Sequence, residues 1–316
     1  MCSSDLCPAH VNGIVGFKPT VGLLSTEGIV PISASQDTAG PMTKTVTDAI
    51  KMMDVLTNSN RFSEAQARSA EDLRIGVLRF AQGENPGINT LFDQSLAALK
   101  EAGVTLVDIT EFDLSDPHYW QNELAVLEIE FAESLDKFFA QRKERLAVSS
   151  LASLIEFNLE NSDIELTLFG QEHLISSSER PSVDSPDHRT ALNAIQTASR
   201  QNGIDQLLLE AEVNLLVAPS GPLSPPIDLI NGDVWPAWLG AGYMAAIAGY
   251  PHLTLPMGEL RGLPLGLSVI GAANKDVEVL TGGVVIEQVL GFAPTPGFLA
   301  SAAHHPKIQP AIEGGK

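Results

Sequence analysis

Apolar residues between positions 46 and 57 recur at three- and four-residue intervals. Val46, Ile50 and Met53 fall on one side of a helix with 3.6 residues per turn. Thr45 comes directly before this pattern, and threonine is a common N-cap because its hydroxyl accepts a bond from a free backbone N–H group. The pattern therefore predicts a helix over residues 46–57.

The next segments alternate between strand and helix patterns. A short apolar run predicts a strand over 73–80, an amphipathic pattern ended by Gly103 predicts a helix over 89–103, and a second apolar run predicts a strand over 104–110. Two strands joined by a helix are typical of a parallel sheet covered by helices. We therefore expect an α/β fold.

The remaining segments extend this α/β pattern to about residue 291. Further helices are expected over 119–147, 149–161, 190–212, 239–250 and 277–291, a strand over 213–219, and an antiparallel hairpin over 252–257 and 263–271. Glycine and proline are frequent in 8–45 and predict short strands and tight loops there. The polar stretches 58–73 and 170–190 and the proline-rich 220–229 are expected to be loops, and 292–316 a flexible tail.

Composition narrows the class of protein. The chain has 316 residues, 44% of them hydrophobic, which is enough to build a core and excludes global disorder. Nineteen basic against 39 acidic residues give a net charge of −20, so neither nucleic acid nor an anionic membrane is an expected partner. No apolar run approaches the roughly 20 residues that span a bilayer. We expect a soluble protein, by default cytoplasmic.

Cysteine and histidine offer few candidate sites. Cys2 and Cys7 are the only cysteines, which excludes a disulfide framework and a four-thiolate zinc site; we expect two free thiols, paired only if a local turn joins them. His304 and His305 are adjacent and unsuited to binding one metal ion together. His252 lies in an apolar strand and is interpreted as a hydrogen-bonded core histidine. No metal or cofactor is expected.

Two acidic features have different expected roles. Asp37 stands beside Gly40 and Pro41 among small hydroxyl residues, which suits either a buried carboxylate that accepts several N–H bonds or an ordinary surface turn. The acidic helix with Glu123, Glu128, Glu130 and Glu133 is expected to present a solvated face rather than a catalytic pair of carboxylates.

Three blocks of the sequence resemble the amidase signature family. These are CPAHVNGIVGFKPTVGLLSTEGIVPISASQDTAGPMTKTVTDAIKMMDVL (7–56), NLLVAPSGPLSPP (214–226) and IAGYPHLTLPMGELRGLPLGLSVIG (247–271). A weaker likeness covers LASLIEFNLEN and LFGQEHL within 151–174. The resemblance runs in order from Cys7 to about residue 291 and is most similar to bacterial amidases that include peptide amidase. It implies one domain with a mixed sheet sandwiched by helices.

The resemblance also implies a mechanism. The family cleaves a carboxamide to an acid and ammonia with a Ser–cis-Ser–Lys triad, in which lysine acts as the base through the middle serine. Counting back from Pro8 places Ser4 in the nucleophile's column, although Cys2 and Ser3 replace the usual glycines. Asp37, Gly40 and Pro41 are implied to support the site from beneath the nucleophile loop. Lys18 is implied to be structural rather than the base.

In the family pattern, the catalytic lysine and middle serine would precede residue 1. We therefore expect a chain truncated at its N-terminus, inactive alone and prone to self-association through an exposed sheet edge. One alternative is a non-catalytic remnant, or a subunit completed by another chain, as in the related transamidase. A minor alternative is an N-terminal nucleophile hydrolase that uses Cys2, but its two stacked antiparallel sheets conflict with the strand–helix order of 73–110.

Overall fold

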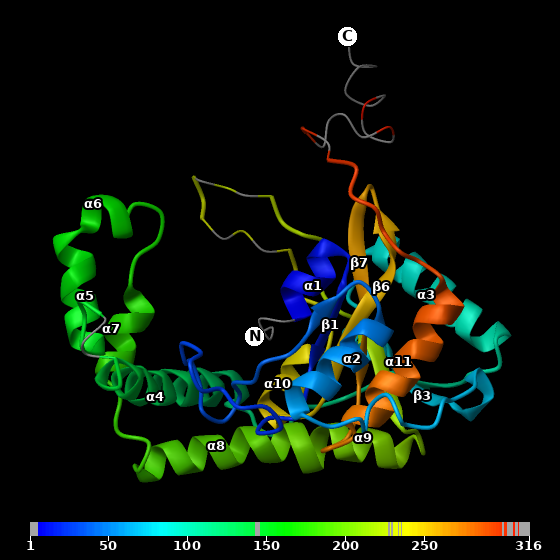
Figure 1. Cartoon of the computed structure of the whole chain (residues 1–316), viewed down its shortest axis with the longest axis horizontal. Helices are drawn as coiled ribbons and strands as arrows, with labels where there is room; N and C mark the ends of the chain where they lie inside the picture. The colour runs from blue at the N-terminus through cyan, green and yellow to red at the C-terminus, as the bar shows by residue number, and fades with distance from the viewer. Residues whose placement is uncertain are drawn as a thin grey trace.

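Seven strands form one mixed sheet in the order β2-β1-β6-β7-β5-β3-β4 (Figure 1). The computed structural model describes residues 6–142, 146–226, 228, 230–232, 234, 236–298, 300–301, 306 and 309. The strands are β1 (Val15–Lys18), β2 (Met42–Thr43), β3 (Arg74–Leu78), β4 (Thr105–Ile109), β5 (Leu215–Pro219), β6 (His252–Leu260) and β7 (Leu263–Ile270). The pairs β5–β3 and β3–β4 are parallel, and the others are antiparallel.

Helices cover both faces of this sheet. The α-helices of the described residues are α1 (Leu6–Asn12), α2 (Val46–Thr57), α3 (Pro86–Glu101), α4 (Tyr119–Ala140), α5 (Leu151–Glu160), α6 (Ser162–Glu165), α7 (Glu172–Ser178), α8 (Pro186–Ser199), α9 (Asp205–Glu210), α10 (Gly242–Ala248) and α11 (Asp276–Leu290), of which α5 to α7 lie apart from the sheet. Leu215 and Val217 of β5 join the core under α2, α3 and α11, while Leu216 and Ala218 join the core under α9 and α10. The expected mixed sheet sandwiched by helices is confirmed.

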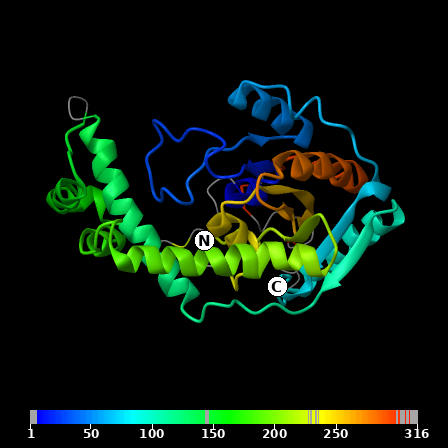
Figure 2. The same ribbon diagram turned by 90° about the horizontal axis from the view of Figure 1, so that it is seen from below.

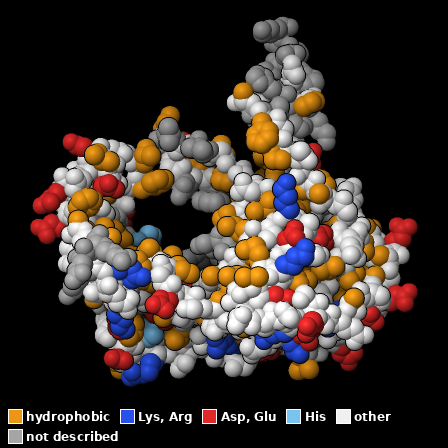
Figure 3. All heavy atoms as spheres, in the orientation of Figure 1, with side chains coloured by type: hydrophobic (Ala, Val, Ile, Leu, Met, Phe, Trp, Pro, Cys, Tyr) orange, Lys and Arg blue, Asp and Glu red, His pale blue; other side chains and the backbone are white. Residues whose placement is uncertain are grey.

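Helices α4 to α7 form an arm beside the sheet. Figure 1 shows α5, α6 and α7 well away from the strands, and a small separate core of Leu135, Phe139 and Leu151 joins α4 to α5. In the space-filling view, a hollow separates this arm from the sheet-bearing body (Figure 3). Figure 2 shows the connection between β1 and β2 and the long helix α8 running from the body to the arm.

The structure confirms the local patterns that the sequence carries most strongly. Helix α2 begins after Thr45, whose side chain accepts the N–H of Asp48. Strands β6 and β7 form the expected hairpin, and the two turn residues Arg261 and Gly262 have φ angles of 56° and 78°. Positive φ at both central residues is the requirement of the type I′ turn that joins two twisted strands tightly.

Other boundaries differ from expectation. The predicted helix over 190–212 is three pieces, because α8 ends in the π-helical turn η3 (Arg200–Ile204) before α9. A Cβ on Gly203 would lie 2.5 Å from the carbonyl oxygen of Ala198, so a regular side chain cannot be accommodated at this kink. Helix α4 ends seven residues before its predicted end.

Three regions predicted as loops contain helical segments. Residues 6–12 form α1, residues 172–178 form α7, and the short 3₁₀ turn η1 (Ala70–Asp72) interrupts the predicted linker; a second such turn, η2 (Arg79–Ala81), follows β3. Serine is a weak helix former, but in α7 the hydroxyl of Ser177 bonds the carbonyl of His173 within the helix, and Ser176 bonds Glu128 of α4. Tertiary contacts therefore override local preference there. Residues 292–298 have no regular structure.

Candidate active site

Helix α1 is fixed to the sheet by one buried histidine. His10 is 2% exposed; its Nδ1 accepts the backbone N–H of Gly266 at 3.1 Å, and its Nε2 lies 2.8 Å from the carbonyl oxygen of Pro222. A carbonyl can only accept, so Nε2 carries the proton and the ring is neutral. Burial lowers the pKa of His10, which favours the same neutral form.

Two glycines make room for this histidine. A Cβ on Gly221 would lie 3.0 Å from Nε2 of His10, and a Cβ on Gly266 would lie 3.2 Å from its Cβ and 2.5 Å from Oγ1 of Thr254. Larger residues at either position would push the ring off its bonds. The loop after β5 and the middle of β7 therefore form a niche that only glycine permits.

A row of hydrogen-bonded side chains crosses the sheet beside this niche. The row runs from Ser268, which donates to Ser220 at 3.0 Å, to Thr254, whose hydroxyl lies 2.6 Å from that of Ser220. Nε2 of His252 lies 2.7 Å from the Ser268 hydroxyl. Because Ser268 donates its only proton to Ser220, it must accept from His252, so Nε2 of His252 carries the proton.

His252 is enclosed rather than poised for catalysis. It is 2% exposed, and burial together with the charge of Lys18 lowers the pKa of His252 to about 3. Its Nδ1 accepts no hydrogen bond within the described residues. The interpretation of His252 as a core histidine is confirmed. Lys18, its register partner on β1, is 1% exposed and donates to the carbonyl of Pro19 at 3.1 Å.

The predicted nucleophile Ser4 and the preceding Cys2 lie outside the described residues, as do His304 and His305. Cys7, in the first turn of α1, is disulfide-bonded, so the expectation of a free thiol there is wrong. The small number of cysteines, on which that expectation rested, does not report the oxidation state of an individual thiol.

The carboxylate of Asp37 closes a local turn in the β1–β2 connection. Its carboxylate accepts the N–H groups of Ile32 at 2.8 Å and Ser33 at 3.0 Å, and its own N–H donates to the carbonyl of Ser33. The side chain is half-buried; burial raises the pKa of Asp37, and the two N–H bonds oppose this shift. These bonds fit the alternative of an ordinary turn, and the support that Asp37 is implied to give to the nucleophile loop stays a prediction. Further along, the carbonyl of Pro41 accepts the N–H of Phe17 in β1.

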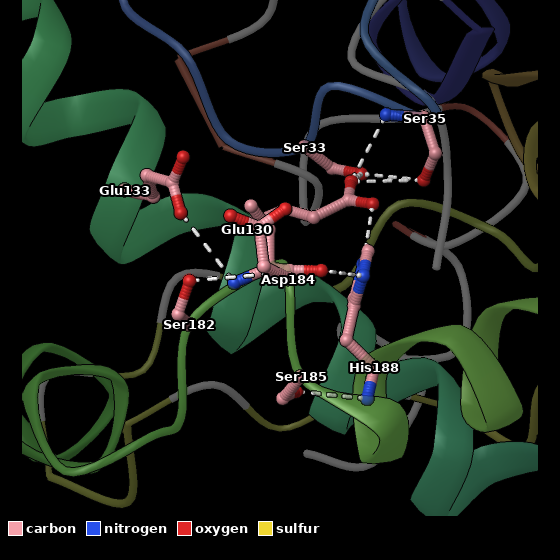
Figure 4. Close-up of polar contacts among 9 residues, drawn as sticks. Ser33, Ser35, Glu130, Glu133, Ser182, Asp184, Ser185 and His188 are labelled. Atoms are coloured by element: carbon pink, nitrogen blue, oxygen red, sulfur yellow. Dashed lines mark hydrogen bonds and ion pairs between the residues drawn. The ribbon is translucent and has the colours of Figure 1, made fainter.

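The acidic face of α4 is not solvated, which corrects the sequence expectation. Glu123, Glu128 and Glu130 are each 5% exposed or less. Figure 4 shows Glu130 facing the β1–β2 connection: its Oε2 accepts from the Ser33 hydroxyl at 2.6 Å and from the Ser35 N–H and hydroxyl, both at 2.9 Å. Its Oε1 lies 2.9 Å from Nε2 of His188. Partners supplied by other segments offset the cost of burying this charge.

The other two buried acids differ in their pairing. Burial would raise the pKa of Glu128, but hydrogen bonds from Ser176 and Arg180 outweigh it and lower that pKa. Burial raises the pKa of Glu123, whose Oε1 accepts no bond from the part of the chain that the structure describes. Glu133 is partly exposed and forms an ion pair with Lys137.

The described residues were searched for a metal site and for a pocket near α1. Among the described ranges, no three His, Cys, Asp or Glu side chains are grouped to hold a metal ion. A surface pocket of about 530 Å³ lies between residues 65–72 and the beginning of α11, and none of its lining residues belongs to α1 or to the turn of Asp37.

No helix in the described segments is both long and apolar enough to cross a membrane.

Sequence reasoning missed the residues that anchor this region. His10, Ser220 and Ser268 make no motif of their own, because their partners are 16 to 256 positions away. A period-2 signal was present: His252 and Thr254 stand on one face of β6, opposite the apolar Leu253 and Leu255. Polar residues at alternate positions of a buried strand indicate a buried polar network.

Comparisons with known proteins agree with this architecture. The model of the Amidase family matches residues 3–280. Mandelamide hydrolase of Pseudomonas putida is 27% identical over 92% of this chain, and a glutamyl-tRNA(Gln) amidotransferase subunit of Rhodospirillum rubrum is 27% identical over 93%. The native peptide amidase of Stenotrophomonas maltophilia superposes with a TM-score of 0.82 and 32% identity over 94% of the chain.

The chain spans 57% of the length of the mandelamide hydrolase, 61% of the amidotransferase subunit and 62% of the peptide amidase. The seven-stranded mixed sheet and its helical layers are therefore shared with proteins that are longer than this sequence. The match to the family model covers more than half of the chain, from the segment before α1 into α11. This chain belongs to the amidase family.

Proposed function

We propose that this chain carries the serine-bearing part of an amide hydrolase. Ser4 Oγ would attack the carbonyl carbon of a linear carboxamide, ammonia would leave with the proton taken from Ser4, and water would then release the acid from the acyl-serine. The observation that carries the proposal is the family match, which begins at residue 3 and so includes Ser4.

The surroundings of α1 support this role. A nucleophile is effective only when the elements that carry it are held rigidly. Ser4 stands two positions before Leu6, the first residue of α1, and α1 is held by two bonds of His10 to Gly266 and Pro222. The sheet next to α1 is stiffened by the hydrogen bonds that connect His252, Ser268, Ser220 and Thr254. Asp37, Gly40 and Pro41 are proposed as further support, as the resemblance implies.

The family resemblance does not identify a catalytic base within this sequence. The family pattern places its lysine and middle serine before residue 1, and Lys18 is enclosed beside His252 in the sheet. We therefore propose that the 316-residue chain alone is inactive, since removing a triad member costs on the order of 10⁴ in rate.

The direct test is ammonia release from a peptide amide and from an aryl amide by the purified chain. The expected result is release no faster than in buffer. Release that Ser4→Ala abolishes would show that the chain contains its own base, and the inactivity proposal would fail. Release that Cys2→Ala abolishes would instead support the N-terminal nucleophile alternative.

Two alternative functions can be distinguished from this proposal, one by the fold and the other by adding a partner chain. An N-terminal nucleophile hydrolase needs two stacked antiparallel sheets, whereas the described strands form one mixed sheet. A subunit completed by another chain remains an alternative, because one relative is itself named as a subunit of an amidotransferase. That alternative predicts ammonia release only after the partner chain is added.

A further inference from the structure

One carboxylate joins the arm to the β1–β2 connection. Glu130 Oε2 receives three hydrogen bonds from Ser33 and Ser35, which lie 97 and 95 residues earlier in the chain (Figure 4). Ser33 is 1% exposed and Glu130 is 3% exposed, so water cannot readily replace these bonds. The same turn contains Asp37, which holds Ile32 and Ser33 from the other side.

The contact between Oε1 of Glu130 and the ring of His188 shows how many protons these two side chains hold. Nδ1 of His188 lies 2.9 Å from the carbonyl oxygen of Val183, and a carbonyl can only accept, so Nδ1 carries a proton. Nε2 lies 2.9 Å from Oε1 of Glu130. If neither atom of this second pair carried a proton, two lone pairs would face each other in a buried site. The Glu130–His188 contact therefore contains one proton.

That proton belongs to His188. Three donors on Oε2 stabilise the carboxylate form of Glu130, and an ionised carboxylate next to a ring with two N–H groups makes a charge-assisted pair. The charged groups around the pair include Asp37 on the β1–β2 connection and Asp184, Asp187 and Arg189 around the beginning of α8. They also include Glu128 and Glu133 on α4, which form ion pairs with Arg180 and Lys137.

We propose that Glu130, paired with protonated His188, is a positioning residue that holds residues 33–37 against α4. This proposal rests on the proposed function, which it deepens. There, Asp37 and the following Gly40 and Pro41 are proposed to support the site of Ser4. Glu130 acts through this segment and does not touch substrate. Glu130 thereby ties α4 to the β1–β2 connection through Ser33 and Ser35, and to α8 through His188.

The charge pair makes the clamp depend on pH. While His188 holds both protons, the contact to Glu130 is intact; loss of the Nε2 proton as pH rises leaves a lone pair facing the carboxylate and weakens the clamp. Glu130→Gln changes this behaviour in a defined way. The glutamine oxygen can accept from Ser33 and Ser35, and its NH₂ group can donate to the bare Nε2 of neutral His188.

The test is amide hydrogen exchange of Ser35 in the full chain, followed by NMR or mass spectrometry from about pH 5 to about pH 9. In the wild type we expect the Ser35 protection factor to fall about tenfold or more across this range. In Glu130→Gln it should stay level, and in Glu130→Ala it should be low throughout. Glu160→Gln, at an exposed position on α5, is the matched control and should follow the wild type.

Two outcomes would overturn the proposal. One is equal Ser35 protection in Glu130→Ala and wild type, and the other is the same pH profile in Glu130→Gln and wild type. If Glu130→Ala does not fold, the glutamine variant decides alone, together with ¹⁵N spectra of His188 that must show two N–H groups at low pH. None of these readouts needs turnover, so a failure of the proposed hydrolase function would leave them unchanged.

Discussion

Thr20 and Asp276 are 256 residues apart in the chain and share two hydrogen bonds. The backbone N–H of Thr20 donates to Oδ1 of Asp276 at 2.8 Å, and its hydroxyl donates to Oδ2 at 2.7 Å. Asp276 is the first residue of α11 and is 3% exposed. This contact joins the loop after β1 to the last helix of the fold, so segments from opposite ends of the sequence are held together by one buried carboxylate.

Asp276→Ala should lower the free energy of unfolding by about 2–4 kcal/mol, because it leaves two part-buried donors of Thr20 without an acceptor. Thr20→Val removes only the hydroxyl and should cost about 1 kcal/mol. Urea unfolding of both variants and of the double mutant measures the coupling. Asp163→Ala, at an exposed position of α6, is the control. A loss at Asp276 no larger than at Asp163 would contradict the structure.

His252 should make the chain less stable in acid. Its pKa is lowered from 6.5 to about 3 in the folded chain, so the unfolded chain binds the proton more readily and stability is lost as pH falls below 6.5. Between about pH 7 and 5.5, the wild type should lose about 1 kcal/mol more than His252→Gln, which keeps a donor for Ser268. Denaturant midpoints at the two pH values measure this difference. Parallel losses in both proteins would show that His252 is not enclosed.

Asp37→Ala should cost about 1–3 kcal/mol, since the N–H groups of Ile32 and Ser33 lose their acceptor in a half-buried turn. Glu27→Ala, in the exposed part of the same connection, should cost only a few tenths. Thermal unfolding of the two variants compares them. A cost at Asp37 as small as that at Glu27 would mean that the turn is held by other contacts.

Local patterns predicted much of the fold. The capped helix α2, the parallel pair β3–β4 and the hairpin β6–β7 each follow from signals within one continuous segment of the chain, such as Thr45 or the Arg261–Gly262 turn. The sequence also distinguished His252 from a general base through its apolar strand. These features depend on neighbours in the chain, which periodicity and turn chemistry report directly.

Burial of charge could not be predicted in the same way. Glu130 looks like any surface acid on α4, and its burial depends on Ser33, Ser35 and His188 arriving from segments 58 to 97 residues away. The kink at Gly203 likewise follows from the closeness of a neighbouring carbonyl. Such features arise only when elements pack together, so single-sequence patterns carry no signal for them.

Self-association is expected from the edges of the sheet. Strand β2 pairs with β1 over only two residues, and Ile29, Val30 and Ile32 of the connection between them are exposed by 44% or more. An incompletely covered edge and exposed apolar side chains favour association despite a net charge of −20. Sedimentation velocity at several concentrations should show oligomers. A single monomeric species with one cooperative melting transition would count against this expectation.

The measurement that tests the central claim most directly is ammonia release by a chimera. The N-terminal part of the Stenotrophomonas maltophilia peptide amidase, up to the position that aligns with Ser3, is joined directly before Ser4. This supplies the segment in which the family pattern places the lysine, middle serine and glycines. We predict release from a peptide amide that Ser4→Ala reduces by about 10³-fold or more. Release that Ser4→Ala leaves unchanged would contradict the assignment of Ser4 as the nucleophile of this amidase-family chain.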